Sequence, residues 1–354
     1  MLIFTLVNDE FYMQRCLELA AKGSGWVSPN PMVGAVLVYK GQVIGEGYHE
    51  YFGGPHAEVN CIQSVAPQNA ALISSSTLYV SLEPCNHFGK TPPCTEFIIR
   101  NQIPSVIVAC TDPHSRVCGT GINRLVAAGV KVTTGVLQKE ATSLNKYFFM
   151  YHRHQRPYVI LKWAQTNDGF ISDNSHRPLK ISNPITDRLV HGWRANSDAI
   201  LVGTNTLIHD NPSLTTRLWP GKNSLRVVID KQLQAPLNHV IYNNESPTLI
   251  FNSIQSSQID NNEWIRLTDQ KSWVRPIVQI LHQRGIQSLL VEGGSQLLQH
   301  FLQEQLWDEV RIITNTHLQV QQGKAAPKLI NATFLSSQFI RNDRIDIYQP
   351  PTQL

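Results

Sequence analysis

Two short stretches decide the fold of the first part of the chain: HAE at residues 56–58 and LEPCNHFGKTPPC at residues 82–94. The residues in them that are predicted to bind a metal are His56, Cys85 and Cys94. A catalytic zinc ion commonly takes three protein ligands and leaves its fourth position to water. One imidazole and two thiolates meet that need, so the stretches predict a zinc site. Glu58 follows His56 by two residues and is predicted to move a proton without binding the metal.

The predicted ligands lie where helices should begin. The apolar spacing of residues 57–65 predicts a helix from about His56, and a second helix is predicted over residues 94–100. A helix N-terminus favours the thiolate that binds metal. H-x-E followed by P-C-x-x-C is the signature of zinc deaminases. This chain has eight residues, 86–93, where the signature has two, and the insert adds a lysine. A buried histidine and buried apolar cysteines are the structural alternative.

Around this predicted site, helices and strands alternate. Residues 9–21 have helical spacing, and two strands at 33–39 and 43–47 flank a glycine turn. Further strands are predicted at 77–82, 105–110 and 130–134, with helices at 121–128 and 137–151. This alternation predicts an α/β layered domain of about 145 residues.

A polar segment ending in Pro157 marks the predicted boundary, which gives domains 1–150 and 151–354. His152 and His154 have no cysteine or carboxylate cluster beside them, so they are predicted to be solvated linker. Beyond them, strands are predicted at 158–164, 198–203, 225–230, 247–252, 288–292 and 309–315. Helices are predicted at 184–195, 273–284 and 295–305. This is a second α/β unit, and no internal repeat links it to the first.

Composition and charge narrow the class of protein. The 354 residues suggest two or three domains, and 42% apolar with 16% charged residues suit a globular fold. A net charge of +4 without a long basic run favours a small-molecule partner over nucleic acid. The absence of a long apolar stretch and of a basic N-terminal start predicts an unexported, cytoplasmic protein. Cysteines 16, 61, 110 and 118 are predicted to be core thiols.

The first half resembles the deaminase half of a bifunctional riboflavin-biosynthesis family. PNPMVG at 29–34, GEGYH at 45–49 and the long insert carry the resemblance. It implies a cytidine-deaminase-like three-layer domain that uses zinc to remove the 2-amino group of a phosphoribosylated diaminopyrimidine. It also implies that Asn30, His49 and Lys90 contact the substrate. An amide suits a pyrimidine edge and a lysine suits a 5′-phosphate, although Lys90 has the alternative of an ordinary exposed lysine.

The second half resembles the reductase half of the same family. The stretches that carry the resemblance are KWA at 162–164, DG at 168–169, ISNP at 181–184, WRANSDAILVG at 193–203, DNPSLT at 210–215 and VEGG at 291–294. They imply a dihydrofolate-reductase-like domain that transfers a hydride from NADPH to C1′ of a ring-opened ribosyl group, giving a ribityl group. No residue by itself shows a 2′-phosphate site, so NADPH rather than NADH is implied by the family alone.

Matching positions imply two sets of contacts. The implied NADPH contacts are Ala164, Lys180, Thr206, Asp210, Gly294 and Ser295, and the implied substrate contacts are Arg194, Leu214, Arg217 and Glu292. A strand, two glycines and a helix start at 288–305 form a typical phosphate cradle, although a plain turn is the alternative. No G-x-G-x-x-G follows a strand, so the Rossmann fingerprint is not present and a nicotinamide nucleotide is expected to bind in another way. Arg194 has the alternative of an ion pair at a helix end, and Asp210 that of a turn residue. RPLK at 177–180 departs from the family's usual Ser-x-Trp, which leaves no aromatic ring beside Lys180.

Two other interpretations stay open. One is a nucleoside or tRNA deaminase whose second domain only binds a nucleotide. The insert between Cys85 and Cys94 and the modest net charge argue against this interpretation. In the other, one half is degenerate, and the second half is the better candidate because residues 166–167 and Lys180 depart from the commoner pattern. The sequence does not define the oligomeric state, and a homo-oligomer is compatible with it.

Overall fold

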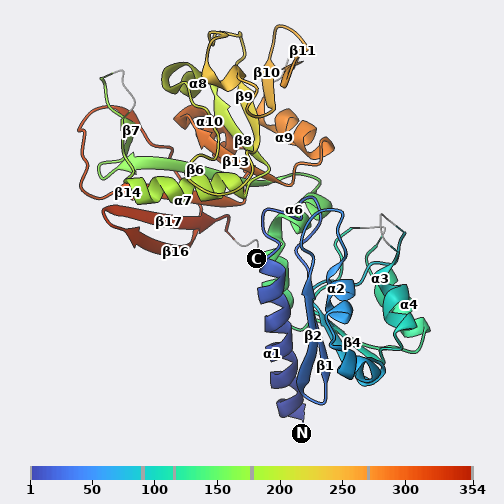
Figure 1. Ribbon diagram of the computed structural model, residues 1–354. Helices are drawn as coiled ribbons and strands as arrows, with labels where there is room; N and C mark the ends of the chain where they lie inside the picture. The colour runs from blue at the N-terminus through green and yellow to red at the C-terminus, as the bar shows by residue number, and fades with distance from the viewer. Residues whose placement is uncertain (1, 89–91, 115–116, 176–178, 269–271, 352–354) are drawn as a thin grey trace. The chain divides into compact units, whose positions relative to one another are not determined.

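The computed structural model describes residues 2–88, 92–114, 117–175, 179–268 and 272–351. The chain divides into two compact units, Met1–Gln155 and Arg156–Leu354 (Figure 1). Among the described residues, no helix combines the length and the hydropathy that crossing a bilayer requires.

The first unit is built on a five-stranded sheet of order β2-β1-β3-β4-β5. Its strands are β1 (Gly34–Tyr39), β2 (Gln42–Tyr48), β3 (Thr77–Val80), β4 (Ser105–Val108) and β5 (Lys131–Thr134). β1 is antiparallel to β2 and β3, whereas β3, β4 and β5 are parallel. The loops that follow β3 and β4 therefore leave the same edge of the sheet.

Helices cover both faces of this sheet. They are α1 (Leu2–Ala21), α2 (Ala57–Gln63), α3 (Cys94–Arg100), α4 (Thr120–Ala127), α5 (Gln138–Leu144), α6 (Lys146–His154) and the 3-10 helix η1 (Pro67–Ser75). Successive strand residues point to opposite faces, so Val36 packs with Met13 of α1 while Leu37 packs with Leu125 of α4. The two buried clusters make three layers, which confirms the expected architecture.

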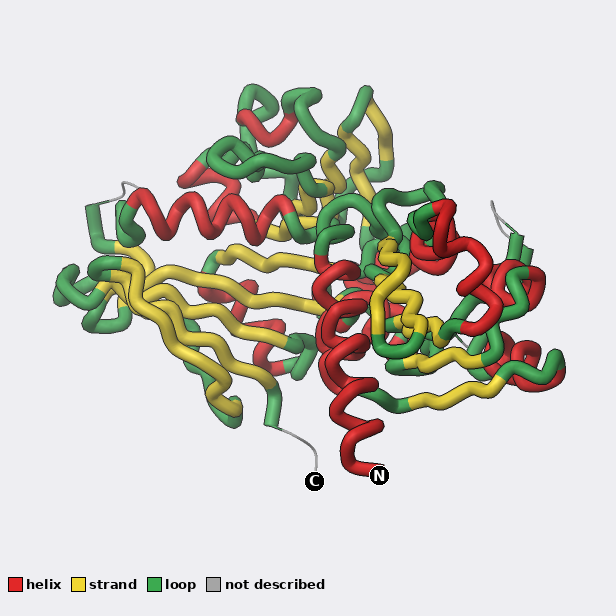
Figure 2. The backbone as a smooth tube through the Cα atoms, turned by 60° about the horizontal axis from the view of Figure 1, so that its bottom comes forward, coloured by secondary structure: helices red, strands yellow, loops and turns green. Residues whose placement is uncertain are grey.

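The second unit contains a ten-stranded sheet of order β11-β12-β10-β9-β8-β13-β6-β14-β17-β16 and a two-stranded sheet of β15 and β7, and Figure 2 shows the long strands side by side. The strands are β6 (Tyr158–Thr166), β7 (Phe170–Ser172), β8 (Ala199–Gly203), β9 (Leu225–Ile229), β10 (Thr248–Asn252), β11 (Ser257–Ile259), β12 (Asn262–Arg266), β13 (Ser288–Gly293), β14 (Glu309–Asn315), β15 (Lys324–Ala325), β16 (Thr333–Ile340) and β17 (Asp343–Gln349). From β12 to β14 the neighbouring strands are parallel, so their carboxyl ends meet at one edge.

Helices pack on both faces of the large sheet. They are α7 (Pro184–Ala195), α8 (Thr204–Asp210), α9 (Val274–Gln283), α10 (Ser295–Gln303) and the 3-10 helix η2 (Val240–Tyr242). Leu281 of α9 and Phe301 of α10 are fully buried in the main core with Leu161 of β6. On the opposite face, Val190 of α7 packs against Ile313 of β14. Since buried apolar area drives folding, these contacts fix the strand ends that carry the second site.

Two expectations for residues 137–154 were wrong. The predicted single helix is interrupted at Asn145, because its side chain exchanges two 2.8 Å hydrogen bonds with the backbone of Met32. Residues 152–154 are not linker but the last turn of α6, and the ring of His152 lies 4.4 Å from that of Phe148. A buried side chain that pairs with distant backbone outweighs the local helical pattern.

Candidate active sites

The three predicted zinc ligands converge in the first unit. His56 is the residue before α2, Cys94 is the first residue of α3, and Cys85 lies in the loop after β3. His56 Nδ1 lies 3.2 Å from Cys94 Sγ and 3.4 Å from Cys85 Sγ, and the ligand atoms of all three lie within 4.8 Å of one another. Tetrahedral zinc with its usual bond lengths separates nitrogen and sulfur ligands by about 3.6 Å. The cluster therefore has the donor set and the spacing of a zinc site.

Without a metal ion, the three groups of this cluster share protons. A hydrogen bond from Cys94, followed by the contact with His56, lowers the pKa of the Cys85 thiol to about 4. The pKa of Cys94 is raised because it keeps the proton that it shares with Cys85. The hydrogen bond with Cys85 raises the pKa of His56 to about 9. A metal ion replaces these shared protons, since zinc binds thiolates and neutral imidazole.

Glu58 is buried next to these ligands. Its side chain is only 3% exposed and contacts the Cys94 thiol, and burial raises its pKa. A raised pKa brings a carboxyl group closer to the range in which it both accepts and releases a proton near neutrality. The geometry therefore supports a proton-transferring role for Glu58.

A second buried glutamate holds the loop that carries Cys85. Glu83 Oε1 accepts hydrogen bonds from the backbone N–H groups of Gly121 and Ile122 at 2.9 and 3.2 Å. Glu83 Oε2 accepts from those of Asp112 and Gly119 at 3.1 and 3.0 Å. One carboxylate thus satisfies orphan donors at the start of α4, as an N-cap does, and joins the loops after β3 and β4.

Two of the three predicted substrate contacts of this site lie together. Asn30 Nδ2 donates to His49 Nε2 at 3.1 Å, and His49 Nδ1 donates to the carbonyl of Pro55 at 2.9 Å. His49 is 3% exposed, and burial lowers its pKa, so the neutral imidazole orients the Asn30 amide. The ring of His49 lies 5.5 Å from that of His56, which places the pair beside the zinc ligands. Lys90 lies outside the described residues.

The second site centres on a buried ion pair. Arg194 of α7 donates to both oxygens of Glu292 at the end of β13, at 2.7 and 2.6 Å, and the two side chains are 15% and 7% exposed. Burial alone raises the pKa of Glu292, but Arg194 and Lys162 outweigh it and hold the value at about 2. Burial lowers the pKa of Lys162, and Glu292 opposes that effect. Glu292 is therefore an anion held between two cations.

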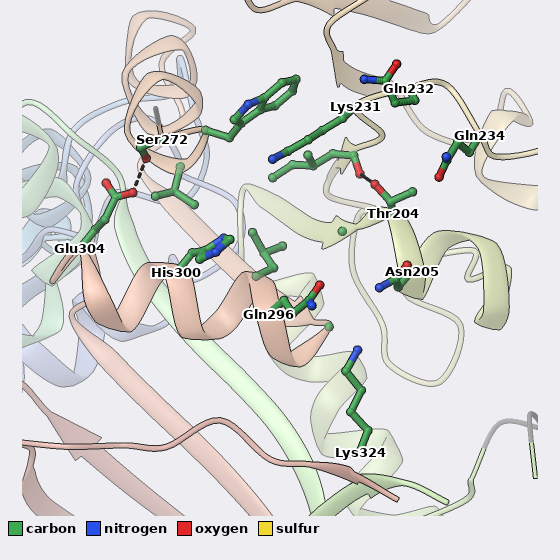
Figure 3. Close-up of a pocket in the computed structure, with 16 residues that line it drawn as sticks. Thr204, Asn205, Lys231, Gln232, Gln234, Ser272, Gln296, His300, Glu304 and Lys324 are labelled. Carbon is green, nitrogen blue, oxygen red and sulfur yellow. Dashed lines mark hydrogen bonds between the residues drawn. The ribbon is translucent and has the colours of Figure 1, made fainter. Parts of the chain in front are cut away.

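A cavity of about 440 Å³ opens at the carboxyl edge of the large sheet. Figure 3 shows its polar residues, among them Thr204, Asn205, Lys231 and Lys324. Gly294, at the start of α10, also lines it. A Cβ on Gly294 would lie 3.3 Å from Thr206 Oγ1 and 4.0 Å from Lys324 Nζ. The backbone of Gly294, the N-terminus of α10 and the ammonium group of Lys324 together form a corner of the cavity that suits an anion.

The remaining residues implied to contact NADPH or the substrate lie on several different elements of the second unit. Ala164 lies near the end of β6, and Asp210 is the last residue of α8. Lys180 is exposed and pairs with Asp187, and the Ser295 hydroxyl donates to the carbonyl of Ala325 at 3.0 Å. Of the six implied NADPH contacts, Gly294 lines the cavity and Thr206 approaches it. Among the implied substrate contacts, Leu214 is 2% exposed, and the exposed Arg217 donates to the hydroxyl of Ser213.

Three residues of these sites were missed from the sequence. Lys162 interrupts an otherwise apolar strand, a signal that could have singled it out. Glu83 stands between a strand and a metal ligand, which also hints at a special role. Lys324 carries no local signal, because only the pairing of β15 with β7 brings it to the second site.

The folds and the two sites define a class of protein, a zinc-dependent deaminase joined to a nucleotide-dependent reductase. Residues 6–110 match the family model of the cytidine and deoxycytidylate deaminase zinc-binding region. Residues 157–318 match the RibD C-terminal domain, which has the expected dihydrofolate-reductase-like fold.

Known proteins that match nearly the whole chain narrow this class. The riboflavin biosynthesis protein RibD of Aquifex aeolicus is 39% identical over 307 residues, which is 85% of each chain. That of Escherichia coli is 35% identical over 325 residues, 86% of each chain. The structure of a diaminohydroxyphosphoribosylaminopyrimidine deaminase/5-amino-6-(5-phosphoribosylamino)uracil reductase from Thermotoga maritima is 34% identical, with a TM-score of 0.88 over 98% of this chain and 99% of that one.

The chain belongs to the RibD family. It is a bifunctional enzyme of riboflavin biosynthesis that combines a deaminase with a reductase, and its cofactors are zinc and NADPH. The expectations of the fold, of both activities and of both cofactors are thereby confirmed.

Proposed function

We propose that the first unit deaminates 2,5-diamino-6-(5-phosphoribosylamino)pyrimidin-4-one, with His56, Cys85 and Cys94 as zinc ligands and Glu58 as the proton carrier. The cluster of one imidazole and two thiols beside a buried carboxyl group carries this proposal. When bound, zinc supplies Lewis-acid activation of water. Glu58 takes a proton from the attacking water and delivers it to the leaving amine. The Asn30 amide, oriented by His49, holds the pyrimidine edge, and Lys90 holds the 5′-phosphate.

The second unit then reduces the ribosyl side chain of 5-amino-6-(5-phosphoribosylamino)uracil. NADPH supplies the hydride when bound. Glu292, held ionised by Arg194 and Lys162, accepts hydrogen bonds from the polar groups of the substrate. The exposed Arg217 binds its phosphate, because a planar guanidinium group offers parallel donors. Arg194 donates from Nε and Nη2 to Glu292, so it contacts the substrate through its remaining N–H groups. The backbone of Leu214 borders the substrate.

The cavity at the edge of the large sheet supports a nucleotide site in the second unit. Thr206 and the segment from Gly294 to Ser295 hold the diphosphate, while Ala164, Lys180 and Asp210 complete the contacts of NADPH. The deaminase is assigned to the unit Met1–Gln155 and the reductase to the unit Arg156–Leu354, which moves the boundary from the expected residue 150 to the end of α6. The substrate of both is a free small molecule, and the enzyme works in the cytoplasm without nucleic acid or membrane.

One sequence of measurements tests both activities. Zinc-loaded protein is incubated with the diaminopyrimidine substrate, and ammonia release is followed before and after NADPH is added. We expect ammonia first and NADPH oxidation only after it. Ammonia release without NADPH oxidation would refute the reductase. A folded Glu58→Gln variant that fails to reduce supplied deaminated substrate would refute separate sites.

A further inference from the structure

The chain segment that carries Arg217 runs along one face of α7. A Cβ on Gly192 of the helix would lie 3.1 Å from two atoms of the Trp219 ring. Further along, a Cβ on Gly221 would lie 3.0 Å from the Cβ of Ala195. Separations this short leave no room for a side-chain atom at either glycine. Helix α7 therefore sets the path of the backbone around Arg217.

His191 of α7 holds this segment by a hydrogen bond. The residue is 6% exposed, and its Nδ1 accepts the backbone N–H of Arg217 at 3.1 Å. A ring nitrogen that accepts carries no proton, so the imidazole is assigned as neutral with its proton on Nε2. Burial, followed by the charges of Arg194 and Arg217, lowers the pKa of His191, and the opposite effect of Glu292 and Asp187 is outweighed. The surroundings therefore favour the neutral form that this hydrogen bond requires.

The guanidinium group of Arg217 is bonded locally. The side chain is exposed and donates to the hydroxyl groups of Ser213 and Thr215, the second at 3.4 Å. Both hydroxyl groups belong to the same segment, so these two bonds do not by themselves fix the guanidinium group relative to the rest of the site. The hydrogen bond to His191 instead ties the segment to α7, the helix that also carries Arg194.

We propose that His191 is a positioning residue of the reductase, which holds Arg217 where its guanidinium group meets the phosphate of the substrate. The inference rests on the proposed function, in which Arg217 binds that phosphate. Arg194 lies one turn further along α7 and is fixed by both oxygens of Glu292. One helix thus sets the separation between the buried ion pair and the phosphate-binding arginine. A donor that is already held in place binds a ligand with less loss of entropy than a donor on a free segment.

Two polar substitutions test whether the acceptor at Nδ1 matters. The amide oxygen of His191→Asn comes close to the place of Nδ1 and keeps an acceptor for the Arg217 N–H, whereas His191→Gln carries its amide at the place of Nε2. NADPH oxidation is measured on the full-length protein with supplied 5-amino-6-(5-phosphoribosylamino)uracil. We expect His191→Gln to raise the KM of this substrate about 5- to 10-fold, the effect of losing one hydrogen bond, while kcat and the KM of NADPH stay unchanged. His191→Asn should keep a KM close to that of wild type. His317→Gln is the matched control, because His317 is an exposed histidine of the same unit outside this segment.

A double-mutant cycle with Arg217 separates the outcomes. Because His191 acts through Arg217, adding His191→Gln to Arg217→Met should raise the KM no further than Arg217→Met alone. The positioning role would be overturned by effects that multiply in the double variant, by a His191→Asn as impaired as His191→Gln, or by a fall in kcat at unchanged KM. An Arg217→Met variant with the KM of wild type would instead overturn the proposed phosphate contact. Far-ultraviolet circular dichroism shows whether each variant is folded, and an unfolded His191→Gln is replaced by His191→Leu, which also lacks the acceptor and fills the buried space.

Discussion

The substitution Glu83→Gln should loosen the loop that carries a zinc ligand, although it changes only one side-chain atom. The carboxylate of Glu83 accepts four backbone N–H groups, two on each oxygen, and the side chain is 4% exposed. Either orientation of a glutamine amide places an NH₂ group against two of those N–H donors. Two hydrogen bonds are then replaced by unfavourable contacts between donors.

The expected loss follows from the number of bonds. A hydrogen bond to a charged group contributes about 1.5–3 kcal/mol, so losing two lowers the local stability by about 3–6 kcal/mol. Because the four donors belong to residues 112, 119, 121 and 122, the effect should concentrate around them and not in the whole domain. Since a tenfold change corresponds to about 1.4 kcal/mol, amide exchange in this segment should accelerate more than about 100-fold.

Hydrogen exchange followed by mass spectrometry on the full-length protein measures this directly. Release of zinc to a colorimetric chelator provides the second measurement, because Cys85 is two residues from Glu83. Glu140→Gln is the control, as Glu140 is exposed in the same unit and a surface change should alter stability by less than about 0.5 kcal/mol. Exchange and zinc release as slow in Glu83→Gln as in Glu140→Gln would refute the role given to the four bonds.

Other predictions concern the two sites separately. Glu58→Gln should abolish ammonia release while zinc content, measured by atomic absorption, stays at one ion per chain; a loss of zinc would make Glu58 a ligand instead. Chelation of zinc should stop deamination and leave reduction of supplied deaminated substrate intact, and a parallel loss of both rates would contradict this. Arg194→Met leaves the buried Glu292 carboxylate without its ion-pair partner and should lower the free energy of unfolding of the second unit by about 3–5 kcal/mol, measured with denaturant. Arg188→Met is the control, because Arg188 is exposed on α7 and its loss should have little effect. Because the pKa of Glu292 falls from 4.5 to about 2 on folding, the stabilisation is complete above about pH 5 and declines as the pH approaches 2. The gap in melting temperature between wild type and Arg194→Met should therefore narrow on acidification, and a constant gap would contradict the ion pair as its origin.

Much of the zinc site could be predicted from the sequence because each ligand is marked by a signal in its own neighbourhood of the chain. His56 and Cys94 sit at helix starts, as predicted, and the helix of residues 94–100 has the predicted bounds. The break at Asn145 could not be predicted, since its cause is hydrogen bonding to Met32, far away in the chain. The hairpin of β16 and β17 was missed for another reason. β16 is exposed along nearly its whole length, so it lacks the alternation of buried apolar residues that marks a half-buried strand.

The second site was less accessible because it is assembled from distant segments. Glu292 and Gly294 belong to one motif, yet Arg194 and Lys324 reach them only through the order of strands in the sheet. The identity of a residue can indicate a charge, but the partner of that charge depends on the topology. For this reason Lys162 became meaningful only when it was found beside Glu292.

The end of β13 also links the two ligands of the reductase thermodynamically. Glu292 faces the proposed substrate site, Gly294 lines the nucleotide cavity, and a single residue, Gly293, separates them. Gly293 has a φ of +121°, a conformation that other residues rarely adopt. A shift of this backbone on binding of either ligand would therefore be felt at the other site. The resulting change in affinity would be the same in both directions, because such coupling is reciprocal.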